Sequence, residues 1–87
     1  MEEEYKSLVW RVIKHINMLS EDEEYFGSED YTNTEIDVYS SAIKLGAVDQ
    51  DWYDRRLKYN EIELCGELLF VLGMHLMYKQ AEQELKN

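Results

Sequence analysis

The chain has 87 residues, a formal net charge of −10 and a pI of about 4.5, and 45% of its residues are hydrophobic. We expect one folded domain over residues 1–87, because domains typically run from about 50 to 250 residues and a disordered acidic chain carries fewer aromatic residues. The charge argues against direct binding to nucleic acid or to an anionic membrane surface, since both are negatively charged.

The first stretch of the chain has the apolar spacing of an amphipathic helix. Tyr5, Leu8 and Val12 recur every three or four residues, so they share one stripe when each residue advances about 100°. The spacing predicts a helix from about residue 3 to residue 19. Trp10 lies off this stripe, which makes it a candidate contact for a partner.

The middle of the chain is less clear from its sequence. Residues 28–33 are polar and turn-rich, and they predict a loop. Thr32 and Glu35 have the form of a capping box and Gly46 is a plausible terminator, so a helix over residues 34–45 is favoured. Alternating apolar residues in the same segment also fit a strand, and that alternative stays open.

The rest of the chain predicts a short helix and a long one. Asp49 or Asp51 can cap the short helix and Asn60 the long one, although the two helices could also be continuous. From residue 62 to residue 78 the long helix is apolar on nearly every side, which is typical of a buried helix. The sequence therefore predicts an all-α fold, a small bundle of three or four helices around an apolar C-terminal helix.

Two glycines of the long helix lie on nearly one line, because they are seven residues apart. Each costs up to about 1 kcal/mol of helix stability relative to alanine, so we expect a packing reason for them. A neighbouring helix could approach them closely, either within the chain or from a second copy in a homodimer. The seam for self-association would consist of Gly66, Phe70, Gly73, Met74 and Met77.

Negative charge is concentrated in residues 20–37, which hold eight acidic residues and no basic one. A solvated loop is the plain explanation, but solubility needs less charge than this, and the cluster favours a cationic partner. Aromatic rings among the acids can stack on arginine while carboxylates pair with its guanidinium group. The predicted partner-binding residues are Glu21, Asp22, Glu23, Glu24, Tyr25, Phe26, Glu29, Asp30, Tyr31, Glu35 and Asp37, together with Trp10.

The spacing of these acids also suggests what they imitate. As one helix, residues 20–37 would span about 27 Å and space their charges roughly as phosphates are spaced along a nucleic-acid strand. In size, acidity and lack of motifs, the chain resembles small inhibitor proteins of phages and mobile elements, including anti-CRISPR proteins. The resemblance implies a module that blocks a basic, nucleic-acid-engaging surface of a target protein such as a nuclease.

The sequence holds few residues for metal or redox chemistry. Cys65, His15 and His75 are too few for a zinc site, and all three are expected to be structural. A single cysteine cannot form an internal disulfide, and the acidic start lacks the pattern of a secretory signal. We therefore expect a cytoplasmic protein without a cofactor or a bound metal.

One pair of carboxylates offers an enzymatic alternative. Glu63 and Glu67 lie one turn apart, and residues 67–72, Glu-Leu-Leu-Phe-Val-Leu, loosely resemble the magnesium-binding helix of all-helical nucleotide pyrophosphohydrolases. Such enzymes need a second acidic pair on a partner helix, where the first predicted helix has apolar residues instead. The favoured prediction is therefore a protein without enzymatic activity.

Overall fold

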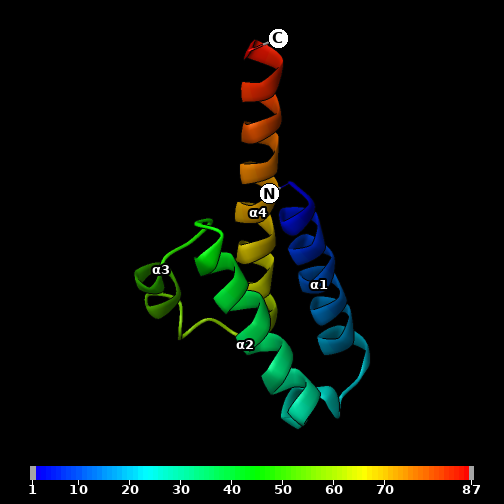
Figure 1. Ribbon diagram of the computed structural model, residues 1–87. Helices are drawn as coiled ribbons and strands as arrows, with labels where there is room; N and C mark the ends of the chain where they lie inside the picture. The colour runs from blue at the N-terminus through cyan, green and yellow to red at the C-terminus, as the bar shows by residue number, and fades with distance from the viewer. Residues whose placement is uncertain (1, 87) are drawn as a thin grey trace.

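The computed structural model describes residues 2–86, which form helices without any strand (Figure 1). The predicted all-α fold is thus confirmed. In chain order the elements are α1 (Glu2–Glu21), the short 3-10 helix η1 (Tyr25–Gly27), α2 (Glu29–Lys44), α3 (Gln50–Asp54) and α4 (Glu61–Lys86).

Helices α1 and α4 run antiparallel and form the largest contact of the fold (Figure 1). Their apolar stripes meet in a core that includes Leu8 and Val12 of α1 and Leu68 and Leu72 of α4, all fully buried. Tyr5 closes the upper end of this core, and its hydroxyl donates a hydrogen bond to the carbonyl oxygen of Leu45, with 2.8 Å between the oxygens. The helical stripes therefore fold as their spacing predicts.

Helix α2 begins earlier than its sequence suggests. The Ser28 hydroxyl accepts a hydrogen bond from the backbone N–H of Tyr31, so Ser28 and not Thr32 is the N-cap. Glu29 and Asp30 stand in the first turn, where carboxylates interact favourably with the helix dipole. The prediction of a loop over residues 28–33 is therefore wrong, and the helical alternative for residues 34–45 is correct.

Gly46 follows α2 in a left-handed conformation, with φ of 79°. Since a side chain strains this backbone region, we expect Gly46→Ala to lower the free energy of unfolding by about 1–2 kcal/mol, measured by urea denaturation. Gly27→Ala is the matched control, because open space surrounds Gly27 and its φ is not positive. Equal destabilisation by the two substitutions would contradict the conformational argument.

The two remaining caps follow the sequence. The carboxylate of Asp49 accepts from the N–H of Trp52 at 2.7 Å and begins α3. The side-chain oxygen of Asn60 accepts from the N–H of Glu63 at 2.9 Å, so α4 starts as a separate helix. Its last turns extend past the other helices, as Figure 1 shows in orange and red.

Helix α4 is buried on one side only. Leu64, Cys65, Leu68 and Leu72 face the core, whereas Phe70 on the opposite side is largely exposed. The other helices cover only the core side of α4, although an apolar sequence of this kind is typical of a buried helix. Within residues 2–86, no helix combines the length and apolar character needed to cross a membrane.

Candidate functional site

Acidic side chains gather at the turn that joins α1 to α2, at the lower end of Figure 1. All of them are exposed, and within residues 2–86 none forms an ion pair with a basic side chain. The Asp22 carboxylate also accepts from the backbone N–H of Glu24 at 3.0 Å, which helps to order the turn. We call this surface the acidic end, and it consists of Glu21, Asp22, Glu23, Glu24, Glu29 and Asp30.

Two of the eight acids in residues 20–37 do not belong to the acidic end. Asp37 forms an ion pair with Arg11 of α1 and is thereby neutralised within the chain. Glu35 is half-buried and lies beside Glu61, the first residue of α4. The turn at residues 22–28 also breaks the single helix that phosphate-like spacing would require. Charge is therefore gathered at one end instead of being drawn out in a line.

Most aromatic rings of the acidic segment point into the protein. Tyr25, Tyr31 and Tyr39 are buried, so the prediction of Tyr25 and Tyr31 as surface contacts for arginine is wrong. The reason is the early start of α2, which places Tyr31, Val38 and Tyr39 on its core-facing side. Phe26 remains available, with 58% of its surface exposed.

His15 anchors these inward rings. Its Nδ1 lies 2.7 Å from the Tyr25 hydroxyl oxygen, and its ring stacks on Tyr31 with 5.4 Å between centroids. The side chain is fully buried, and burial lowers the pKa of His15 below its ordinary 6.5, although the charge of Glu61 opposes this shift. The expected structural role of His15 agrees with this position, and η1 is tied to α1 through it.

Sequence reasoning did not find the polar cluster of His15, Tyr31, Glu35 and Glu61, which lies between α1, α2 and the start of α4. Burial, followed by the neighbouring Glu61 carboxyl, raises the pKa of Glu35 to about 7 from an ordinary 4.5. Nε2 of His15 and Oε2 of Glu61 are buried without a hydrogen-bond partner. Burial and the neighbouring Glu61 therefore both favour the protonated form of Glu35.

A helical signal for this cluster exists in the sequence. Glu35 lies four residues after Tyr31 and four before Tyr39, on the same side of α2. The shared side of Tyr31, Glu35 and Tyr39 can be recognised only if the helix is known to begin at Glu29. The partner of Glu35, Glu61, lies 26 residues further along the chain. Tertiary packing, and no local motif, brings the two carboxyl groups together.

The carboxylates considered for magnesium are engaged in other contacts. Oε1 of Glu63 accepts from the side-chain amide of Asn60 at 3.0 Å. Oε1 of Glu67 pairs with Arg56 at 3.4 Å, and the Arg56 guanidinium also lies 4.5 Å from the centre of the Trp52 ring. Within residues 2–86, no group of three His, Cys, Asp or Glu side chains is placed to hold a metal ion.

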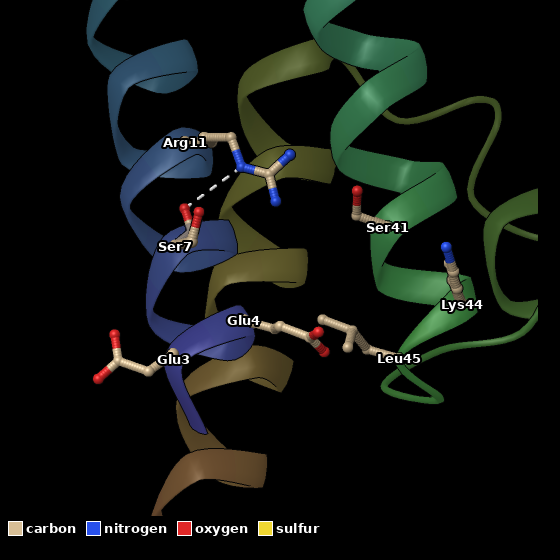
Figure 2. Close-up of a pocket in the computed structure, with 7 residues that line it drawn as sticks. All are labelled: Glu3, Glu4, Ser7, Arg11, Ser41, Lys44 and Leu45. Atoms are coloured by element: carbon tan, nitrogen blue, oxygen red, sulfur yellow. Dashed lines mark hydrogen bonds between the residues drawn. The ribbon is translucent and has the colours of Figure 1, made fainter. Parts of the chain in front are cut away.

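A groove separates the N-terminal half of α1 from the C-terminal end of α2 (Figure 2). It encloses about 500 Å³, and in the view of Figure 2 the Glu4 side chain extends toward Leu45. Acidic and basic residues line it in equal number, so its charge does not select a ligand of either sign. Its lining consists of Glu3, Glu4, Ser7, Arg11, Ser41, Lys44 and Leu45.

The opposite side of the molecule carries an apolar surface on α4. The exposed fractions of Phe70, Met77 and Met74 are 70%, 67% and 52%. A Cβ atom built on Gly66 or Gly73 would meet nothing within 4 Å, so no packing inside the chain explains these glycines. We call this surface the outer face of α4, and it consists of Gly66, Phe70, Gly73, Met74 and Met77, the residues of the predicted seam.

The structure thus separates the predicted contacts into two surfaces. Six acids form the acidic end, while the seam residues share one side of α4; Trp10, 68% exposed, lies on α1 outside both sets. Arg55 and Arg56 pair with Asp51 and Glu67 and do not neutralise the acidic end. Comparison with protein-family models, curated proteins and solved structures finds no match for this chain.

Proposed function

We propose that this protein is a non-catalytic binding module whose acidic end docks on a basic surface of another protein, and thereby blocks nucleic acid from that surface. One observation carries the proposal: six exposed carboxylates lie within ten consecutive residues, 21–30, and none of them is paired with a base of the described chain. Such a concentration exceeds what solubility needs and destabilises the monomer by self-repulsion.

The placement of the arginines strengthens the electrostatic argument. Arg11, Arg55 and Arg56 each pair with an acid outside the acidic end, so their charges are already partly offset. The field of the acidic end therefore extends into solvent over a screening distance of about 8 Å at physiological salt. A field of this kind raises the rate of association with a cationic surface.

Nucleic acid is the natural competitor for such a surface, because proteins bind phosphates with clustered Lys and Arg side chains. The high density of negative charge supports this part of the proposal. A phosphate-like spacing of the charges does not, because the chain turns between α1 and α2. Phe26, exposed beside the carboxylates, offers a ring on which an arginine of the target can stack.

A charge-neutralising variant with a matched control tests the proposal. In the first variant Glu21, Glu23, Glu24 and Glu29 become Gln; in the control Glu3, Glu4, Glu82 and Glu84, all exposed, become Gln. Both variants lose four negative charges, so total charge is held equal. Each immobilised protein is used to capture targets from cell extract, and duplex DNA is then added as a competitor.

We expect the wild type and the control to capture the same basic proteins and DNA to displace them. At about 0.5 kcal/mol per exposed charge pair, the four substitutions in the acidic end should weaken binding roughly thirtyfold. Binding should also weaken steeply as NaCl rises from about 0.05 to 0.5 M. Equal capture by the two variants, or capture that DNA does not displace, would overturn the proposal.

A further inference from the structure

A second surface, independent of the acidic end, is the outer face of α4. Successive residues advance about 100°, so its five residues fall on the side of the helix opposite Leu68 and Leu72. Its three large side chains are the exposed Phe70, Met74 and Met77. Gly66 and Gly73 lower the stability of the helix relative to alanine. The space around both is open, so a side chain would fit there in the monomer. Large exposed apolar groups beside missing side chains are the pattern of a face that another helix covers.

The order of large and small residues along this face identifies the covering helix. We propose that a second copy of the chain packs its α4 antiparallel on the outer face, about a two-fold axis that passes between Val71 and Leu72. In that register Phe70 faces Gly73 of the second copy, and Met77 faces Gly66 of the second copy. Both pairs share one centre, so Phe70 and Met77 each fill a place that a glycine of the second copy leaves empty.

Self-complementarity of this kind is a requirement of a two-fold interface, in which residue i contacts j and j contacts i. An unrelated partner would not require it. A parallel pair of the same helices would place Phe70 against Phe70 and leave the glycines facing each other, with voids between them. Close packing without voids therefore favours the antiparallel arrangement.

Charge favours the same arrangement. Glu67 is the one charged residue between Gly66 and Met77; it lies at the edge of the outer face and pairs with Arg56, so its charge is partly offset within the chain. The acidic end lies near the start of α4, where a pocket joins Phe26 to residues 60–63. Antiparallel packing moves the two acidic ends to opposite ends of the dimer, whereas a parallel dimer would bring them together against their mutual repulsion.

The surface available is close to what a specific dimer uses. Exposed large side chains present about 150 to 250 Å² each when fully open, so the outer face with Ile62 and Tyr78 at its ends offers on the order of 600 Å² per copy. A standard interface buries about 800 Å² per partner. The remaining area, about 200 Å² per copy, has to come from the surface of the neighbouring helices.

An exchange of the two central residues tests the register. Phe70→Gly leaves a void, and Gly73→Phe brings two phenylalanines into collision, so each is expected to weaken dimerisation by about a hundredfold. The double variant Phe70→Gly with Gly73→Phe restores one large and one small residue in every pair, and its dimerisation should return to within about tenfold of the wild type. Both substitutions fall on an exposed position or in open space, so all three variants should keep the monomer fold.

Sedimentation equilibrium from about 1 to 200 µM is the measurement, with circular dichroism as the check on folding. The wild type should approach twice the chain mass of 10.4 kDa. Two control variants should dimerise like the wild type: Ile36→Ala, which is exposed on α2, and the four-charge variant of the acidic end. Failure of the dimer proposal is therefore distinct from failure of the proposed function. A monomer at every concentration, or single variants that the double exchange does not rescue, would overturn the antiparallel dimer.

Discussion

Leu68→Ala is expected to lower the free energy of unfolding by about 3–5 kcal/mol, because the site is closed on every side and cannot collapse around the lost methyl groups. Leu68 is fully buried on α4, in the core that α4 shares with α1 and α2. A domain of 87 residues is stabilised by about 4–13 kcal/mol in total. Urea denaturation followed by circular dichroism gives the difference.

Leu85→Ala is the matched control for this cavity. It makes the same chemical change in the same helix, but Leu85 is 88% exposed near the end of α4. A surface substitution of this kind should change stability by no more than about 0.5 kcal/mol. If the two substitutions proved equally harmful, α4 would not pack against the core as described.

Glu35→Gln is expected to stabilise the protein in alkaline solution and to leave it unchanged in acid. The pKa of Glu35 is about 7 in the folded chain against an ordinary 4.5, so the folded state favours the protonated carboxyl. Wild-type stability therefore falls as pH rises from about 4.5 to above 7, where ionised Glu35 faces Glu61. Because Glu35 is only half-buried, we expect the gain at about pH 8 to be 1–3 kcal/mol, less than the full shift implies.

The measurement is urea denaturation of wild type and variant at about pH 4.5, 6 and 8, and the difference between the two proteins is compared across pH. His15 acts in the opposite direction: its lowered pKa makes protonation costly, so its contribution is lost as pH falls below 6.5. That contribution is present in both proteins and cancels in the difference. Glu84→Gln, at an exposed position on α4, should show no such trend. A difference that does not vary with pH would show that burial and the neighbouring Glu61 do not disfavour the ionised form of Glu35.

The sequence predicted what depends on local spacing. The stripe of Tyr5, Leu8 and Val12 sets the core side of α1, and Gly46 and Asn60 stand where helices end and begin. The prediction from sequence failed at the start of α2, where the polar residues 28–33 were interpreted as a loop. Polar composition does not distinguish a solvated loop from the exposed first turn of a helix that Ser28 caps.

The surfaces, too, were predicted where they depend on local sequence and were missed where they depend on tertiary packing. Exposure of the carboxylates of the acidic end agrees with their position in an acidic run, and the open space at Gly66 and Gly73 excludes the internal packing that the sequence left as one alternative. Glu35 and Glu61 could not be paired from the sequence, because their approach depends on how α2 crosses α4. The inward turn of Tyr25 depends in the same way on His15, ten residues earlier on another element.

The link between His15 and Tyr25 has a consequence for how the acidic end meets another molecule. Because a buried hydrogen bond holds η1 against α1, the backbone that carries the carboxylates around it is ordered before any encounter. A flexible acidic tail would forfeit conformational entropy on docking, at about 1–2 kcal/mol for each backbone residue that becomes ordered. Here the backbone is already ordered by folding, so this entropy cost is not incurred on binding. The attraction between the carboxylates and a cationic surface therefore contributes more fully to the affinity.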